Sequence, residues 1–329
     1  MEIGLALPQY DYSVVGERPL RFETVVEHAT VAAGAGYTSL WLSDHLFLDI
    51  AKYGGSPERQ GVYEPLVTLA ALSRLVPDVR LGTLVLLEAL RPASVLTKAL
   101  SSLDLISGGR LDVGLGAGWY EPEYHALGQE MPRPGERLDR LRECVDVVTG
   151  LLAGGPLDYD GRHHRAAGAE NLPPALQQPR PRVFVGGKGD RLLGLIAEHA
   201  DGWNTCWAWT PAEYRERLAV LEAACERVGR DPASVWRSLG LYALCGENQS
   251  DLERRFERLK ASTPAGVLDG VSLQQWRQGR LVGTIQEVRE LAEEWVSLGV
   301  ETLIIGAGAL PFQVGNIDDV AMLGRALVL

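Results

Sequence analysis

The sequence is short of positive charge. Its 32 lysine and arginine residues are outnumbered by 43 aspartates and glutamates, which gives a formal net charge of −11. An acidic chain has no overall electrostatic attraction for nucleic acid or for an anionic membrane surface, so we expect neither as a partner. An anionic ligand would need a local site, such as the N-terminus of a helix.

Cysteine is also scarce, and long apolar runs are missing. The four cysteines form no Cys-x-x-Cys pair, so neither a disulfide framework nor a zinc site is expected, and we predict reduced thiols and no bound metal. No segment approaches the roughly 20 apolar residues of a membrane span. The N-terminal MEIGLALPQYD has no basic segment followed by a long apolar one, so we expect a cytoplasmic protein.

Short apolar runs alternate with amphipathic stretches of helical period along the whole chain. The expected strands are 2–8, 39–45, 79–88, 110–119, 182–189, 202–207, 236–246 and 302–310. The expected helices between and after them are 21–36, 64–76, 91–109, 136–152, 190–200, 210–229, 250–262, 284–299 and 318–329. Eight such pairs predict an α/β fold of the (β/α)8 TIM-barrel type, with strands covered on both faces.

Two segments are longer than the connections that a minimal barrel needs. They are about 153–181, before the fifth strand, and about 263–283, after the seventh helix. We expect both to lie over the barrel mouth or at a subunit contact. No repeat or low-complexity linker divides the chain, so we predict a single domain over 1–329.

The stretch RLDVGLGAGWYEPEY, residues 110–124, first suggests a dinucleotide-binding turn. The Rossmann pattern needs G-x-G-x-x-G, but here the third glycine, Gly118, comes one place early and Trp119 follows it. In a barrel this stretch is instead the end of the fourth strand. Ligands bind at that end of the strands, and glycines there let a flat molecule approach the backbone.

The most chemically suggestive pair at the strand ends is Asp44-His45. Histidine can donate or take up a proton near neutral pH, and a neighbouring carboxylate can hold its tautomer. A lone histidine at a strand end is also commonly structural, so both interpretations stay open. The remaining histidines lie in expected helices or in the first insertion and are interpreted as structural or solvent-facing.

A second candidate site is the glycine-rich turn Gly186-Gly187-Lys188-Gly189 between a strand and a helix. Free N–H groups at a helix start bind phosphate, and Lys188 adds a positive charge. The alternative is an ordinary tight turn. Trp203, Trp207 and Trp209, near the next strand end, indicate either core packing or an aromatic pocket wall.

Together these segments resemble the bacterial luciferase-like monooxygenase superfamily, and in particular its branch of coenzyme F420-dependent oxidoreductases. The segments that carry the resemblance are GLALPQ, GYTSLWLSDH, VRLGTLVL, RPASVLTKALSSLDLISGGRLDVGLGAGWYEPEYHALG, MPRPGERLDRL, YDGRHHR and PRVFVGGKGDRLLGLIAEHADGWN. They extend from Ile3 to about Asn204, and more loosely to the end. In this order and spacing, the segments are specific for the superfamily. They distinguish much less well between members that use a flavin and members that use a deazaflavin.

The resemblance implies a luciferase-like barrel that holds F420, or alternatively FMN, at its mouth. A non-proline cis peptide at Thr83-Leu84 would lie behind the cofactor ring and support it. The ring and the ribityl chain of the cofactor would contact Gly116, Ala117, Gly118 and Trp119. The turn from Gly186 to Gly189 would hold the phosphate, and His45, positioned by Asp44, would move the proton. Some F420-dependent dehydrogenases carry a glutamate where this chain has Trp119, so a sugar-phosphate dehydrogenase mechanism is not carried over.

Three functions are compatible with this resemblance. In the first, F420 exchanges a hydride at its C5 with a C=C, C=N or C=O group, or with an alcohol, of a medium-sized organic substrate. The second is a two-component monooxygenase that uses FMNH2 and O2, with a separate reductase supplying the reduced cofactor. The third is a barrel that binds the cofactor without turnover. Arginine greatly exceeds lysine, and alanine and glycine are plentiful, which suggests a GC-rich genome and favours an actinobacterial, F420-using source. Family members are often homodimers.

The expected substrate pocket is apolar and lined by aromatic side chains, which suits a medium-sized organic molecule. Besides Trp119, the residues assigned to substrate binding are Gln9, Tyr10, Phe47, Trp207 and Trp209.

Overall fold

The computed structural model describes residues 1–328, and a closed barrel of eight parallel strands forms its centre. β10 pairs with both β9 and β12, and β1 pairs with β12 and β2, so the sheet closes on itself. The barrel strands are β1 (Glu2–Ala6), β2 (Ser39–Leu42), β3 (Arg80–Thr83), β5 (Leu111–Gly116), β8 (Arg182–Gly186), β9 (Gly202–Trp207), β10 (Trp236–Gly246) and β12 (Thr302–Gly306). The predicted TIM barrel and all eight of its strands are confirmed.

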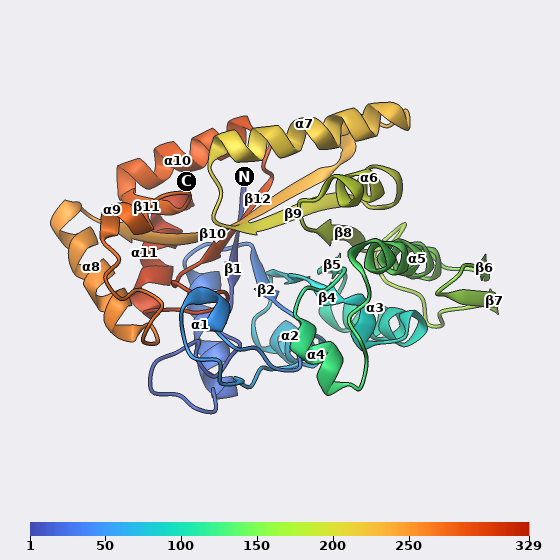
Figure 1. Cartoon of the computed structure of the whole chain (residues 1–329), viewed down its shortest axis with the longest axis horizontal. Coiled ribbons are helices and arrows are strands. Elements are labelled where there is room, and N and C mark those ends of the chain that lie inside the picture. The colour runs from blue at the N-terminus through green and yellow to red at the C-terminus, as the bar shows by residue number, and fades with distance from the viewer. Residues whose placement is uncertain (329) are drawn as a thin grey trace.

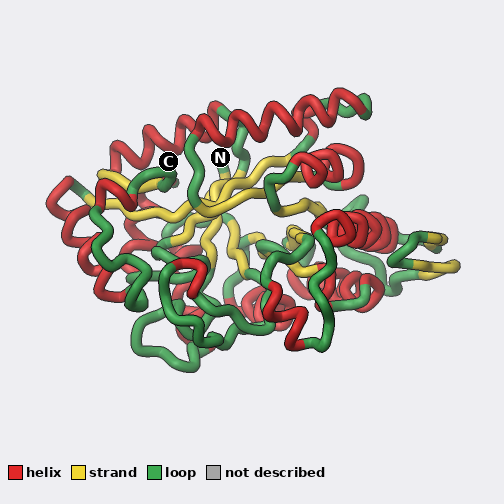
Figure 2. Tube along the Cα trace, viewed as in Figure 1, coloured by secondary structure: helices red, strands yellow, loops and turns green. Residues whose placement is uncertain are grey.

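Helices surround the barrel and bury its outer face (Figures 1 and 2). They are α1 (Phe22–Gly34), α2 (Pro65–Leu75), α3 (Ala93–Ser107), α5 (Pro134–Leu152), α6 (Asp190–His199), α7 (Pro211–Arg227), α8 (Gln249–Ser262), α10 (Ile285–Ser297) and α11 (Ile317–Leu327). Side-chain capping explains why some of these helices begin where they do. Thr210 with Glu213, and Thr284 with Glu287, form reciprocal capping boxes that satisfy the first N–H groups of α7 and α10.

The expected strand 79–88 is interrupted. β3 stops at Thr83, and a two-residue strand, β4 (Leu86–Leu87), resumes the pairing with β5 before a 3-10 turn, η2 (Glu88–Leu90). A short helix, α4 (Glu121–Ala126), follows β5. The interruption and α4 both lie at the carboxyl ends of the strands, where a site is expected.

The two insertions behave differently. The first contains the antiparallel hairpin β6 (Leu157–Asp160) and β7 (Arg165–Ala169), which packs beside α5 and projects from the side of the barrel rather than over its mouth (Figure 1). The second contains α9 (Leu273–Trp276) and β11 (Leu281–Thr284), which pairs with the end of β10. Its Gly266 lies against the backbone of Gly54, near the 3-10 turn η1 (Ala51–Tyr53). One more 3-10 turn, η3 (Pro232–Ser234), precedes β10.

Three large aromatic rings fill the barrel interior on the side nearer the amino ends of the strands. Phe184 lies 5.8 Å from Trp41 and 5.1 Å from Trp236 between ring centres, and all three are buried. Glycines leave the room for them, since a Cβ at Gly82 would lie 2.1 Å from the Trp41 ring and one at Gly114 would lie 2.5 Å from Phe184. We call these three rings the aromatic plug. The plug closes the barrel interior below the carboxyl ends of the strands.

All four cysteines are free thiols in this structure; Cys144, Cys225 and Cys245 are buried and Cys206 is partly buried. Among residues 1–328, no group of histidine, cysteine and carboxylate side chains has the arrangement of a metal site. Within the same range, no helix is both long and apolar enough to cross a bilayer.

Candidate active site

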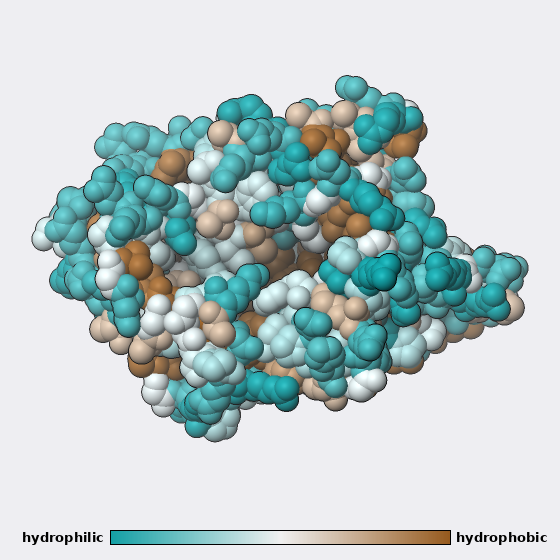
Figure 3. Space-filling model, viewed as in Figure 1, coloured by the Kyte–Doolittle hydropathy of each residue, from teal (hydrophilic) through white to brown (hydrophobic). Residues whose placement is uncertain are grey.

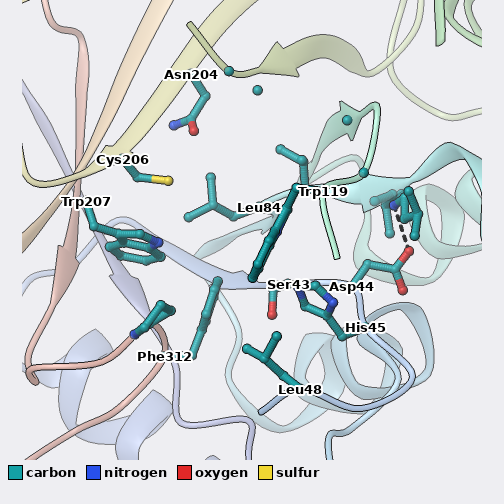
Figure 4. A pocket seen from close by; sticks show the side chains of 18 of the residues that line it. Ser43, Asp44, His45, Leu48, Leu84, Trp119, Asn204, Cys206, Trp207 and Phe312 are labelled. Carbon is teal, nitrogen blue, oxygen red and sulfur yellow. Dashed lines mark hydrogen bonds between the residues drawn. The ribbon is translucent and has the colours of Figure 1, made fainter. Parts of the chain in front are cut away.

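A cavity of about 420 Å³ opens at the carboxyl ends of the barrel strands. Figure 3 shows it as a hollow near the centre of the molecule, with apolar atoms inside and a mostly polar surface around it. Figure 4 shows ten of its residues labelled. The lining comes from strand ends and the loops after them: Tyr10, Ser43, Asp44, His45, Leu48, Lys52, Tyr53, Leu84, Val85, Leu86, Leu87, Gly116, Gly118, Trp119, Glu123, Gly186, Gly187, Lys188, Asn204, Thr205, Cys206, Trp207, Pro311 and Phe312.

The floor of the cavity is the break between β3 and β4. A non-proline cis peptide occurs here, but between Leu84 and Val85, one bond later than the predicted Thr83-Leu84. Thr83 does not line the cavity. Its hydroxyl donates to the Gly114 carbonyl at 3.1 Å and accepts from the Gly114 N–H at 2.8 Å, so it joins β3 to β5 inside the barrel.

Two glycines lie against this floor. A Cβ at Gly116 would come within 2.5 Å of Val85 Cγ2, and one at Gly186 would come within 3.0 Å of Val85 Cγ1. Gly118 and Gly187 line the cavity with φ values of +75° and +142°, which L side chains rarely adopt. Gly116 and Gly186 thus leave the surface around Val85 free of side chains, as a planar ligand requires.

The predicted phosphate turn leads into α6. Gly187 and Lys188 line the cavity, whereas Gly189 is the N-cap of α6 and makes no side-chain cap. Nothing lies within 4 Å of a Cβ placed at Gly189, so the approach to the first N–H groups of α6 is open. Unsatisfied N–H groups and the helix dipole favour an anion there.

Asp44 lines the cavity but does not position His45. Its carboxylate accepts two hydrogen bonds from Arg91, at 2.6 and 3.0 Å, and one from the Leu87 N–H at 2.9 Å, the last drawn as a dashed line in Figure 4. Asp44 therefore ties the end of β2 to the loop after β4. The predicted Asp44–His45 pair is wrong, because the carboxylate is already occupied by Arg91.

The partner of His45 is Glu123 of α4. Nδ1 of His45 lies 2.9 Å from Glu123 Oε2, and Glu123 Oε1 accepts the Leu46 N–H at 2.6 Å. A carboxylate offers only acceptors, so Nδ1 carries the hydrogen and Nε2 is left to exchange a proton with a ligand. The sequence interpretation did not single out Glu123, because it lies 78 positions from His45 along the chain.

Aromatic side chains form the walls, but they are only partly the predicted ones, since Tyr53 and Phe312 take part and Phe47 and Trp209 do not. Tyr10, Trp119 and Trp207 line the cavity, and in Figure 4 Trp119 stands between Leu84 and His45. Trp119 is 44% exposed and carries the Lys52 ammonium 4.0 Å from its ring centre. The Tyr10 hydroxyl lies 2.5 Å from Ser43 Oγ, and burial raises the pKa of this phenol well above its usual value.

Four other predicted contacts lie outside the cavity lining. Gln9 is buried and uses its amide on the backbone of Ser43 and Tyr63. Phe47 packs against Tyr120 and the Arg59 guanidinium, and Trp209 packs between Tyr214 and Lys188. Ala117 also lies outside the lining.

The residues present fit a planar tricyclic cofactor with a phosphate. The evidence is the surface at Val85, left free by Gly116 and Gly186, and the turn Gly187-Lys188 that leads into α6, both on one cavity. His45 lies on the same cavity, so a proton-exchanging group is within the same enclosure as the flat floor.

The chain is similar in sequence to known proteins. A family model described as "Luciferase-like monooxygenase" matches residues 1–302. The chain is 29% identical over 240 residues to pyrimidine monooxygenase RutA of Cronobacter sakazakii, covering 70% of this chain and 67% of the relative. It is 27% identical over 318 residues to the F420-dependent hydroxymycolic acid dehydrogenase of Mycobacterium tuberculosis, covering 93% and 82%.

Solved structures show the same fold. The monooxygenase RslO1 from Streptomyces bottropensis matches with a TM-score of 0.75 and 24% identity, over 99% of this chain and 97% of that one. An F420-dependent secondary alcohol dehydrogenase in complex with an F420-acetone adduct matches with a TM-score of 0.77 and 18% identity, over 99% and 98%.

Proposed function

Because the chain belongs to the luciferase-like monooxygenase family, and is thus a flavin- or deazaflavin-dependent oxidoreductase, we propose that it is a coenzyme F420-dependent oxidoreductase acting on a medium-sized organic substrate. When bound, F420 supplies or accepts a hydride at C5. The observation that carries the proposal is the His45–Glu123 hydrogen bond on the wall of the cavity, 2.9 Å long.

The cofactor would be held by residues that already fit it. Val85, Gly116 and Gly186 would support its ring, and the open start of α6 with Lys188 would receive its phosphate. The protein's task in such enzymes is to bind, orient and shield the cofactor, whose own chemistry does the hydride transfer.

His45 would hold or move the proton that accompanies the hydride. With Nδ1–H donated to Glu123, the Nε2 atom can take a proton from an alcohol or, once protonated, give one to a carbonyl oxygen or a carbon centre. Glu123 orients the ring and stabilises the charged form while it lasts. Trp119, edge-on to His45 with ring centres 5.8 Å apart, would help exclude water from this atom.

Support for F420 over FMN comes from the extent of similarity. The F420-dependent mycobacterial relative aligns with 93% of this chain, whereas the pyrimidine monooxygenase aligns with 70%. The second candidate function is an FMNH2-dependent monooxygenase that consumes O2 and depends on a separate reductase. The monooxygenases among the relatives favour it.

The test is a titration of the purified chain with F420 and with FMN, oxidised and reduced, followed by tryptophan fluorescence. Preference for F420, with substrate reduction under argon and no oxygen uptake in air, is the expected result. Preference for reduced FMN with oxygen uptake would refute the proposal in favour of the monooxygenase. Tight binding with no turnover across a substrate panel would indicate a cofactor-binding barrel without catalysis.

A further inference from the structure

We infer that the mouth of the cavity contains a subsite for the carboxylate of an organic anion, formed by Lys52 and the Trp119 ring on which its ammonium lies. We call these two residues the anion subsite. The inference rests on the proposed function, because it names the class of substrate that the same site would take. That class is a molecule with an apolar, ring-bearing body and one negative group.

Two ring contacts place the Lys52 ammonium at the cavity wall. Its Nζ lies 4.0 Å from the centre of the Trp119 ring and 5.8 Å from that of Tyr53. Lys52, Tyr53 and Trp119 all line the cavity. A ring face attracts an exposed ammonium by only about 0.5–1 kcal/mol, and an ammonium has three N–H donors. The Lys52 ammonium therefore keeps donors for a ligand.

The carboxylate closest to Lys52 along the sequence is engaged elsewhere. Asp49 lies three positions before Lys52 and outside the cavity lining. Its carboxylate accepts from the Tyr120 hydroxyl and, at 3.0 Å, from the Ala51 N–H. Asp49 is thus held by its own donors and leaves the cavity side of Lys52 open.

The carboxylates of the lining also have donors of their own. Asp44 and Glu123 are the acidic residues of the lining. Asp44 accepts two hydrogen bonds from Arg91, and Glu123 accepts from His45 and from a backbone N–H. Their ion pairs are with these two residues and not with Lys52. A ligand carboxylate would therefore meet no competing acid of the lining at the Lys52 ammonium.

Lys52 differs from the other lysines in what its ammonium contacts. The chain has four lysines. Lys98 donates to a backbone carbonyl and Lys260 pairs with a glutamate of its own helix, both outside the cavity lining. Lys188 lies in the turn proposed for the cofactor phosphate, and its ammonium lies over a different ring. Lys52 is therefore the lysine of the lining that remains for a second anionic group.

The rest of the cavity suits the apolar body of such a substrate. Trp207 and Phe312 line it, and Figure 4 shows them across the cavity from Trp119. Trp119 also meets His45 edge-on, with ring centres 5.8 Å apart. A substrate held by its carboxylate at Lys52 therefore extends along Trp119 toward the proton-exchanging Nε2 of His45.

The experiment uses the four lysines as reporters. The full chain is produced with lysine that carries ¹³C at Cε, so that each lysine gives its own NMR signal, and single Lys→Gln variants assign the four signals. The protein is titrated, without added cofactor, with 1-naphthylacetate and with its neutral amide, 1-naphthylacetamide. We expect naphthylacetate to shift the Lys52 signal most. We also expect it to bind about three- to tenfold more tightly than the amide, between the contribution of an exposed ion pair and that of a charge-assisted hydrogen bond.

Lys52→Gln should remove the preference for naphthylacetate and leave the affinity for naphthylacetamide unchanged. The matched control is Lys260→Gln, because the Lys260 ammonium also lies near a ring, 5.6 Å from the centre of Phe256, but outside the cavity. The control should keep the full preference. Lys52 is exposed, so Lys52→Gln should unfold at the same temperature as the parent.

Equal affinity for the two probes, binding of neither, or an unchanged preference in Lys52→Gln would overturn the anion subsite. A preference lost in Lys188→Gln but kept in Lys52→Gln, with the largest shift at Lys188, would place the carboxylate at the turn before α6 and overturn it as well. Because no cofactor is added, these outcomes are independent of the F420 titration. Failure of that titration refutes the proposed function, whereas loss of the preference for the anion refutes the anion subsite alone.

Discussion

Arg91 donates to both carboxylate oxygens of Asp44 at the cavity wall, with Nη1 to Oδ2 at 2.6 Å and Nη2 to Oδ1 at 3.0 Å. The Leu87 N–H donates to Oδ2 as well, at 2.9 Å. The carboxylate is nearly fully buried, so its charge depends on these donors. The pair therefore fixes β4, and with it the cavity floor, to the end of β2.

Asp44→Asn should consequently destabilise the protein by about 1–3 kcal/mol, because the donors from Arg91 and Leu87 lose a charged acceptor while Arg91 keeps its second carboxylate, Glu64, at 2.5 Å. Urea denaturation measures this loss. Glu58→Gln is the control, because its pair with Arg18 is exposed on both sides and should contribute at most about 1 kcal/mol. A loss for Asp44→Asn no larger than that of the control would contradict the role assigned to the pair.

Glu123→Gln should lower kcat by about tenfold or more, since the amide can present an N–H to His45 and favour the wrong tautomer. Steady-state turnover with the cofactor identified by titration is the measurement. Glu121→Gln is the matched control: it lies on the same short helix, is mostly exposed and contacts only the exposed His125 at 3.6 Å. Equal activity of the two variants would remove Glu123 from the mechanism.

Gly116→Ala should weaken cofactor binding by about tenfold or more and cost about 1–3 kcal/mol of stability, because its Cβ would lie 2.5 Å from Val85 and displace the floor. Gly194→Ala in α6 meets nothing within 4 Å and should be neutral or stabilising by up to about 1 kcal/mol. Fluorescence titration and thermal unfolding distinguish the two. Unchanged cofactor affinity in Gly116→Ala would show that the ring does not rest on this floor.

Glu143 of α5 gives the hairpin β6–β7 a pH-dependent anchor. Its buried carboxylate accepts the N–H groups of Arg162, His163 and His164 at 3.1, 2.7 and 2.9 Å. Burial alone would raise the pKa of Glu143, but these donors outweigh burial and lower it below its ordinary value of 4.5. The native state therefore holds fewer protons than the unfolded one, and this stabilisation is present above pH 4.5 and lost as the pH falls below it.

We expect amide hydrogen exchange in 157–169 to accelerate below pH 4.5 beyond its intrinsic pH dependence. Glu143→Gln should show the fast exchange already at pH 7 and lose about 2 kcal/mol of local stability. Asp158→Asn, which removes the charge of an exposed acceptor for Gly168 within the hairpin, serves as the control. Equal protection in the parent and in Glu143→Gln at pH 7 would disprove the anchor.

The local pattern predicted the barrel because each strand carries its own apolar run and each helix its own cap, as Thr210 and Thr284 illustrate. The ends of β5 and β8 were located through their glycines, and His45 through its position at a strand end. Each of these signals is contained within a few neighbouring residues.

What the sequence could not supply is long-range pairing. Whether Asp44 binds His45 or Arg91 depends on where the fold places the residues just before α3. Likewise, Glu123 binds His45 only because the fold places α4 beside the end of β2.

The aromatic plug has a kinetic consequence. With Trp41, Phe184 and Trp236 packed across the lower barrel, a molecule bound on Val85 can reach and leave its place only through the mouth. A molecule that rests on the floor must therefore pass the side chains at the mouth, Trp119 among them, both on entry and on release.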